Sequence, residues 1–330
     1  MTISYPAKTI IKFPSLSMGE GNTPIVELEK GLCAKLDYMM PTLSFKDRGT
    51  VVMMEHALRS GVKRVIQDSS GNAGCSVAAY AARAGIKADI YLGESTPAKK
   101  IKMIEDFGAN VVMVKGTRED VAAAALKEVA KGERYYASHI YNPLFAQGMK
   151  SYIFEVFEQM EGVLPHNIYI PLGNGTLFYG VYYGIQELIA AGKVKSFPQI
   201  ICIQASACAP IYESYKKWHK NRDTSMADKA PTLEPVVNRG TVADGIAIAN
   251  PANGGDILAK MAEIDAGIVA VDDAEIDSAY HTLALKGFHV EMTSAANYAG
   301  YKQFISSVEY INSQKTFTES HLITLCGTTK

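Results

Sequence analysis

Cysteine is scarce in this sequence, and its spacing excludes the sites that cysteine most often builds. The chain has 330 residues and only five cysteines, an odd and widely scattered set: Cys33, Cys75, Cys202, Cys208 and Cys326. None of them forms a C-x-x-C pair, which argues against a zinc site and against the disulfide framework of a small secreted domain. We therefore expect no metal centre and reduced thiols.

The sequence also lacks an excess of charge and a long apolar run. Its 33 Lys and Arg residues nearly balance its 34 Asp and Glu residues, so neither a nucleic-acid groove nor a basic membrane surface is indicated. No segment approaches the roughly 20 apolar residues of a membrane span, and the N-terminus shows no signal-peptide pattern. These absences predict a cytoplasmic protein with neither nucleic acid nor membrane as a partner.

Short apolar runs alternate with longer amphipathic ones along the whole chain. The apolar runs predict strands at 65–67, 89–92, 111–114, 168–170, 200–203, 268–271 and 322–325. Helical patterns stand between them, for example at 75–84, from Pro97 after a Thr96 cap, and at 120–131. Strands that alternate with helices predict an α/β fold with parallel or mostly parallel sheets flanked by helices. Ligands in such sheets bind at the carboxyl ends of the strands.

A lysine motif comes early in the chain. The segment 43–49 reads LSFKDRG and contains Lys46, which can form a Schiff base with a carbonyl cofactor. An ordinary surface lysine is the alternative, because Asp47 and Arg48 follow it directly. Those two neighbours are expected to have structural roles.

A second motif follows the strand predicted at 65–67. The segment 68–74 reads DSSGNAG at the start of a helix, where unpaired N–H groups favour an anion such as an amino-acid carboxylate. Its glycines allow a close approach of the backbone to a ligand. The alternative is an ordinary N-capping turn that uses Ser69 or Ser70.

A third motif lies between the strand predicted at 168–170 and the next helix. The segment 171–177 reads PLGNGTL, which offers backbone amides and the Thr176 hydroxyl to a phosphate. It is neither a Walker A loop nor a dinucleotide fingerprint, because no G-K-[ST] follows and Phe178 stands where a third glycine would be. Alone it could be a tight turn. The three motifs in this order predict pyridoxal phosphate as the cofactor.

These motifs, with several others, resemble the threonine synthase branch of the fold-type II pyridoxal-phosphate enzymes, the tryptophan synthase β superfamily. The further matching segments are GEGNTP at 19–24, NP at 142–143, GMK at 148–150, ADGI at 243–246, VEMTSA at 290–295 and CG at 326–327. The resemblance spans nearly the whole chain. One position differs: many family members have glycine where Leu43 precedes Ser44.

The resemblance implies a role for individual residues. Lys46 would hold the cofactor and move the Cα proton of the substrate, and Asn72 would face the cofactor's 3-hydroxyl group. Cys326 would lie beside the pyridine nitrogen, unless it is a buried structural cysteine. The substrate carboxylate would bind to Ser69, Ser70, Gly71, Asn72 and Ala73, and the cofactor phosphate to Gly173, Asn174, Gly175, Thr176 and Leu177. Lys150 is a candidate for a substrate phosphate, although an exposed helix lysine is the usual alternative.

The resemblance further implies two domains and a homodimer. A large cofactor-binding domain is expected at 1–45 and 145–330, and a smaller, mobile α/β domain at 46–144. The implied activity is that of a lyase of amino-acid biosynthesis, which converts O-phosphohomoserine and water to threonine and phosphate. Three alternatives stay open: a serine/threonine dehydratase or diamino-acid ammonia-lyase, a β-replacement enzyme like cysteine synthase, and a binding or regulatory protein without turnover.

Overall fold

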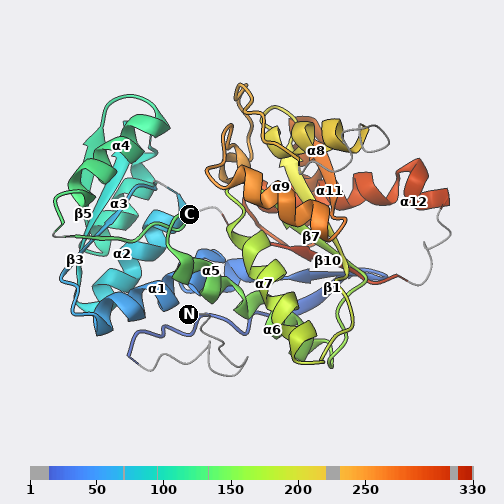
Figure 1. Cartoon of the computed structure of the whole chain (residues 1–330), viewed down its shortest axis with the longest axis horizontal. Helices are drawn as coiled ribbons and strands as arrows, with labels where there is room; N and C mark the ends of the chain where they lie inside the picture. Colours follow the sequence, from blue (N-terminus) through green and yellow to red (C-terminus); the bar gives the residue numbers. More distant parts are fainter. Residues whose placement is uncertain are drawn as a thin grey trace. The chain divides into compact units, whose positions relative to one another are not determined.

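The structure is a computed structural model that describes residues 15–69, 71–94, 96–132, 134–220, 231–312 and 319–328. These residues form two compact units, each built around its own sheet (Figure 1). The first unit holds residues 15–22 and Tyr38–Phe154, and the second holds Thr23–Asp37 and residues 155–328. Both units are α/β, as predicted. Among the described residues, no helix has the length and apolar character that a membrane crossing requires.

The first unit has a four-stranded, fully parallel sheet in the order β5-β4-β3-β6. Its strands are β3 (Arg64–Gln67), β4 (Lys87–Gly93), β5 (Asn110–Val114) and β6 (Tyr135–Tyr136). Its helices are α1 (Lys46–Arg59), α2 (Asn72–Ala84), α3 (Ala98–Asp106), α4 (Arg118–Val129) and α5 (Pro143–Met149). Ile66 and Tyr91 on the sheet pack against Val121 and Ala125 of α4, which joins this helix to the core.

The second unit has a six-stranded sheet in the order β1-β2-β10-β7-β8-β9. The strands are β1 (Ile25–Glu29), β2 (Leu32–Lys35), β7 (Asn167–Pro171), β8 (Gln199–Ala205), β9 (Gly267–Val271) and β10 (His321–Thr324). Only the β1–β2 pair is antiparallel. All five residues of β7 are buried, as expected for a central strand with both faces covered.

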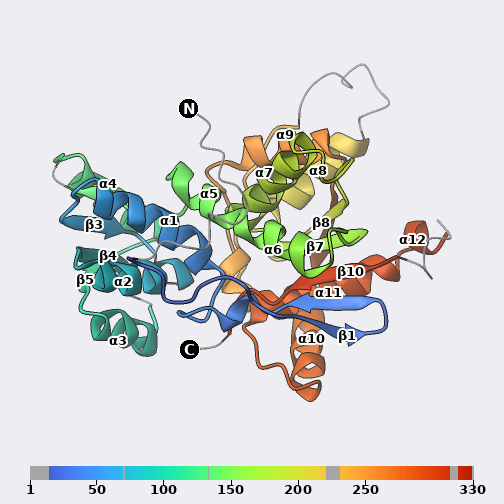
Figure 2. The ribbon, with the colours of Figure 1, turned by 90° about the horizontal axis from the view of Figure 1, so that it is seen from below.

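Helices cover this second sheet on both faces. The helices of this unit are α7 (Thr176–Ala190), α8 (Pro210–Lys220), α9 (Gly254–Glu263), α10 (Asp273–Leu285), α11 (Met292–Ile305) and α12 (Val308–Asn312), of which α12 contacts α11. Figure 2 shows α7, α8 and α9 on one side of the sheet and α10 on the other. Another helix, α6 (Ser151–Gln159), begins in the first unit and ends in the second.

Three helices begin at other residues than the sequence predicts. The helix expected at 75–84 is α2, which begins at Asn72. The other two differ in the residues that form their caps. The helix expected at 120–131 is α4, and it begins at Arg118 because Thr117 and Asp120 form a capping box ahead of it. The expected Thr96 cap is wrong: α3 begins at Ala98, and Pro97 occupies the cap position with an extended ψ of 136°. Both differences reflect cap chemistry within one turn of the helix end.

The first unit extends beyond the predicted 46–144 range at both ends, to Tyr38 and to Phe154. The reason is the tight packing of α5 on α1. A Cβ atom on Gly148 of α5 would lie 2.2 Å from the carbonyl oxygen of Arg48, so only glycine allows this approach. Residues after Pro143 therefore stay with the helix that Lys46 begins.

Leu43 occupies a conformation that suits glycine. Its φ is +63°, and its amide donates to the carbonyl oxygen of Met40 at 2.8 Å in a tight turn. A left-handed conformation costs a residue with a Cβ atom about 1 kcal/mol, and the Leu43 side chain is partly exposed. We expect Leu43→Gly to raise the free energy of unfolding by about 0.5 kcal/mol, measured by urea denaturation. Leu43→Ala keeps the strain and should show no gain; a loss of stability in the glycine variant would contradict this account.

Candidate functional site

Lys46 is the first residue of α1 in the first unit. Its Nζ atom lies 4.3 Å from the centroid of the Phe45 ring and 5.9 Å from that of Phe145, on α5. The residue is partly buried. The amine is thus held against aromatic rings at the start of a helix, in surroundings unlike those of an ordinary surface lysine.

Asp47 fixes the start of α1. Its carboxylate accepts hydrogen bonds from the Thr42 amide at 2.7 Å, from the Thr42 hydroxyl at 2.6 Å and from the Ser76 hydroxyl at 2.5 Å. Ser76 belongs to α2, so Asp47 joins the first turns of two helices. Arg48 is also buried, and its Nη1 donates to the Ser151 hydroxyl at 3.0 Å. Both neighbours of Lys46 are buried and hydrogen-bonded to other parts of the first unit.

The serine-glycine loop leads from β3 into α2. Asn72 is the first residue of α2, and Gly71 precedes it in an extended conformation without a side-chain cap. The first N–H groups of α2 have no acceptor within the helix and favour an anion. Ser69 accepts a hydrogen bond from the Gly71 amide at 3.3 Å, and Ala73 is buried. Ser70, also predicted to bind the carboxylate, lies outside the described residues.

The residues before this loop are held by their own contacts. Arg118, the first residue of α4, donates to the carbonyl oxygen of Asp68, and its Nη2 atom lies 3.7 Å from Asp68 Oδ2. The Tyr136 hydroxyl donates to Asp68 Oδ1 at 3.0 Å. Neither residue was predicted from the sequence. Tyr136 lies in β6, which has only two residues and no periodic pattern, and Arg118 lies before the helix start predicted at 120. Together they set the path by which the chain enters the loop.

In the second unit, the glycine turn connects β7 with α7. Gly175 takes the N-cap position of α7 with a φ of +77°, which glycine adopts without strain. A Cβ atom on Gly173 would lie 2.8 Å from the carbonyl oxygen of Gly245, so the turn also packs closely on the segment 243–246. Thr176 and Leu177 are buried, and Asn174 is partly exposed. No side-chain hydrogen bond caps α7, and the start of a helix is a favourable place for an anion.

Cys326 follows β10 in the same unit and is fully buried. Its Sγ atom lies 3.4 Å from Ser294 Oγ and 3.4 Å from Glu291 Oε1, at the start of α11. Buried beside these residues, Thr293 Oγ1 has no hydrogen-bond partner within the described part of the chain. These contacts join chain segments far apart in sequence, and both Glu291 and Ser294 lie within the matching segment 290–295.

These features fit pyridoxal phosphate. The amides at the start of α7 suit one phosphate monoester, and the buried, unpartnered hydroxyl of Thr293 suits a polar ligand in the second unit. Lys46, at the start of α1 in the first unit, has the primary amine that this cofactor requires. Within the described ranges, no group of three or more His, Cys, Asp or Glu side chains has a geometry that could hold a metal ion.

Lys150 occupies the C-cap position of α5 and is almost fully buried. The alternative of an exposed helix lysine is therefore wrong, because α5 packs into the first unit. The proposed contact of Lys150 with a substrate phosphate stays a prediction.

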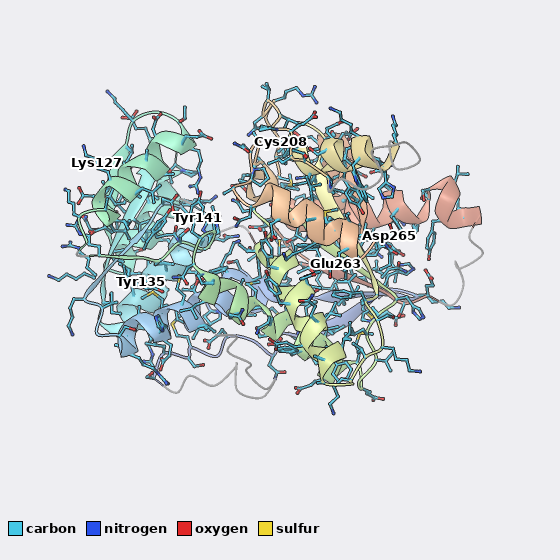
Figure 3. The ribbon with its side chains drawn as sticks, in the orientation of Figure 1. Lys127, Tyr135, Tyr141, Cys208, Glu263 and Asp265 are labelled. Carbon is cyan, nitrogen blue, oxygen red and sulfur yellow. The ribbon has the colours of Figure 1, made fainter. Side chains whose placement is uncertain are left out.

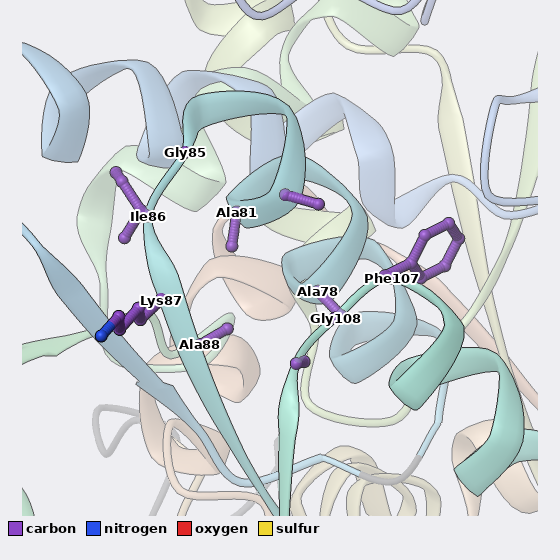
Figure 4. A pocket seen from close by; sticks show the side chains of 10 residues that line it. Ala78, Ala81, Gly85, Ile86, Lys87, Ala88, Phe107 and Gly108 are labelled. Atoms are coloured by element: carbon purple, nitrogen blue, oxygen red, sulfur yellow. The ribbon is translucent and has the colours of Figure 1, made fainter.

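A separate pocket lies at the far end of α2. It has a volume of about 170 Å³, and its lining includes Ala81, Gly85, Lys87 and Phe107 (Figure 4). The 13 residues of α2 put this end about 20 Å from Asn72. The pocket is thus remote from the serine-glycine loop.

His139, between β6 and α5 in the first unit, was not predicted from the sequence as a functional residue. It is 8% exposed, and its Nδ1 atom has no hydrogen-bond partner among the residues described. Burial lowers its pKa well below the usual value, and the positive charges of Lys46 and Arg118 lower the pKa further. The imidazole is therefore neutral at pH 7.

This histidine should make stability depend on pH. Unfolded histidine takes up a proton near pH 6.5, whereas folded His139 does not, so the unfolded state gains relative to the folded state as pH falls. His321, whose pKa burial also lowers, acts in the same direction. We expect the free energy of unfolding to fall by about 2 kcal/mol or more between pH 7 and pH 5, measured by urea denaturation. His139→Phe should reduce this slope; an unchanged slope would refute the contribution of His139.

Comparisons with known proteins agree with pyridoxal phosphate as the cofactor. The family model for pyridoxal-phosphate dependent enzymes matches residues 16–313. The threonine synthase of Methanocaldococcus jannaschii is 34% identical over 300 residues, which cover 88% of this chain and 71% of that protein. The threonine synthase of Methanosarcina acetivorans is 32% identical with the same coverage.

Solved structures share the fold. Threonine deaminase isoform 2 from Solanum lycopersicum has a TM-score of 0.75 and 24% identity, over 93% of this chain and 84% of that one. Maize serine racemase has a TM-score of 0.75 and 20% identity, over 92% and 87%. The fold-type II architecture, the pyridoxal 5'-phosphate cofactor and the lyase class predicted from the sequence are confirmed. The chain belongs to the family of pyridoxal-phosphate dependent enzymes.

Proposed function

We propose that this enzyme converts O-phosphohomoserine and water to threonine and inorganic phosphate. The observation that carries the proposal is the identity of 34% and 32% to two threonine synthases over 88% of the chain. The family match supports the cofactor, but the substrate itself rests on those two relatives.

Each candidate residue has a task in this reaction. The Gly173–Leu177 turn holds the phosphate of the cofactor, which, when bound, acts as an electron sink for the substrate. The amine of Lys46 removes the Cα proton and later returns a proton to the same carbon. The amides at the start of α2, with Ser69, bind the substrate carboxylate, and Asn72 faces the cofactor. Cys326 would offer the ring nitrogen of the cofactor a neutral thiol rather than a carboxylate.

The atoms of the reaction balance without another reactant. The bond between the γ-carbon and the phosphate ester oxygen breaks, and inorganic phosphate leaves with that oxygen. Cβ loses a proton and takes the hydroxyl group of water, and the γ-carbon gains a proton and ends as a methyl group. Lys150, buried at the end of α5, is proposed to bind the leaving phosphate.

We further propose the organisation that the resemblance implies. The second unit acts as the larger cofactor-binding domain, the first as the smaller mobile domain, and the enzyme is a cytoplasmic homodimer. Size-exclusion chromatography with light scattering tests the dimer directly.

The proposed activity is tested by mixing the purified, cofactor-loaded protein with O-phosphohomoserine and measuring phosphate and threonine. We expect both products in equal amounts. Keto acid from serine, threonine or a diamino acid, with no phosphate release, would instead identify a dehydratase or ammonia-lyase. Turnover of O-acetylserine with sulfide would identify a β-replacement enzyme. No turnover of any of these would favour a binding or regulatory protein.

A further inference from the structure

His139 lies beside the serine-glycine loop because of how two strands pair. β6 pairs in parallel with β3, with Tyr135 opposite Val65 and Tyr136 opposite Ile66. The pairing continues for one more residue, since the amide of Ala137 donates to the carbonyl oxygen of Ile66 at 2.8 Å. His139 therefore follows β6 at the same sheet edge where Ser69 follows β3.

The segment around His139 is fixed on both sides. The Ser138 hydroxyl accepts hydrogen bonds from the amides of Ile140 and Tyr141, both at 3.2 Å. Asn142 caps α5 and donates to the Tyr135 hydroxyl at 2.6 Å. Tyr135 and Tyr141, which stand on either side of His139 in the chain, are labelled in Figure 3. The imidazole is thus held by a defined backbone.

The ring of His139 lies close to Lys46. Its centroid is 6.0 Å from that of Phe145 in an edge-to-face arrangement, and the same Phe145 ring lies 5.9 Å from Lys46 Nζ. The charge of Lys46 also acts on His139 electrostatically. The Phe145 ring therefore lies against both His139 and the amine of Lys46.

Two residues close to Lys46 in the sequence carry buried polar atoms without a partner, as His139 does. Ser44 Oγ, Thr50 Oγ1 and His139 Nδ1 are all buried and lack a hydrogen-bond partner within the described ranges. Ser44 lies two residues before Lys46, and Thr50 lies four residues after it, on the same side of α1. A buried polar atom without a partner costs about 1–3 kcal/mol, so each of these atoms favours a polar ligand within hydrogen-bonding distance.

His321 shows what a structural histidine looks like in this protein. It is 6% exposed, similar to His139, yet both of its ring nitrogens have partners. Nδ1 lies 3.1 Å from the Tyr169 hydroxyl, and Nε2 lies 3.2 Å from the Tyr310 hydroxyl. Burial alone does not leave an imidazole unpaired here, so the unpaired nitrogen of His139 needs another explanation.

We propose that His139 determines substrate specificity by hydrogen-bonding the polar group on the substrate's side chain, a hydroxyl or an ester oxygen. The proposal rests on the proposed function, in which the substrate is an amino acid whose amine and carboxylate bind elsewhere. A neutral imidazole can donate to or accept from such a group without adding charge. The class of ligand is therefore an amino acid with oxygen on its β- or γ-carbon.

The test compares two variants of the cofactor-loaded protein. His139→Phe keeps a ring against Phe145 and removes both nitrogens, whereas His139→Asn keeps a polar atom near the position of Nδ1. The probes are L-serine, O-phosphohomoserine and L-alanine, which lacks the side-chain oxygen. Dissociation constants come from the amplitude of the rapid change in the visible spectrum of the bound cofactor, recorded by stopped flow before turnover. Thermal unfolding of each variant is measured alongside.

We expect His139→Phe to weaken binding of L-serine and O-phosphohomoserine at least tenfold and binding of L-alanine less than twofold. His139→Asn should recover most of the lost affinity, and His139→Phe should unfold at the same or a higher temperature because an unpaired polar group has gone. Equal weakening for all three probes, or no weakening, would overturn the proposal while the amino-acid enzyme stands. If wild-type protein with bound cofactor responds to none of the probes, the proposed function fails and this proposal with it.

Discussion

Replacing Lys46 by alanine should lower product formation by about 10³-fold or more. Lys46 is the residue that both holds the cofactor and moves the Cα proton in the proposed reaction, so its loss removes two functions at once. The side chain lies against two aromatic rings, and its truncation leaves the hydrogen bonds of Asp47 in place. The variant should therefore fold, and the loss should reflect chemistry.

The measurement has two parts. The first is the rate of phosphate and threonine formation, and the second is covalent attachment of the cofactor, trapped by borohydride reduction and located by peptide mass spectrometry. Wild-type protein should carry the label on Lys46. Lys102→Ala, at an exposed lysine of α3 that pairs with Asp106, is the control and should keep both rate and label. A label on another lysine in the wild-type protein would contradict the assignment.

The sequence predicted the class of fold because its strands are apolar and its helices amphipathic. The run predicted at 168–170 lies within β7, and that at 65–67 within β3. Both strands are central, where burial on two faces demands continuous apolar residues. β6 was not predicted because it has only two residues, which form a strand by pairing with β3 and show no pattern in the sequence.

Some residues of the candidate site could be predicted from the sequence, and others depend on tertiary contacts. The glycine turn at 173–177 was recognisable because its glycines meet a local backbone need, and Lys46 because its amine stands in a motif that matches a known family. His139 was not, because its significance depends on an unfilled hydrogen bond and on a neighbour more than 90 residues away in the chain. The carboxylate of Glu291 beside Cys326 likewise depends on the contact between α11 and the end of β10. Tertiary pairing of this kind leaves no periodic signal in a single sequence.

Asp47→Ala should lower the free energy of unfolding by about 3–5 kcal/mol. The carboxylate is fully buried, and its hydrogen-bond donors include the Thr42 amide, the Thr42 hydroxyl and the Ser76 hydroxyl. Alanine would leave all three donors in the interior without a partner. Urea denaturation followed by circular dichroism measures the loss. Asp106→Ala, which removes an exposed carboxylate paired with Lys102, should change stability by less than about 0.5 kcal/mol.

The same substitution tests whether Asp47 positions the lysine. Asp47 ties the turn at Thr42 to the beginning of α1 and to α2, which starts at Asn72, so its removal should loosen both motifs together. In variant protein that remains folded at low temperature, we expect slower capture of the cofactor by Lys46 and a higher KM. Asp47→Asn, which retains an oxygen acceptor, should lie between wild type and alanine in both measurements. Full activity and normal cofactor capture in folded Asp47→Ala would show that Asp47 stabilises the unit without placing Lys46.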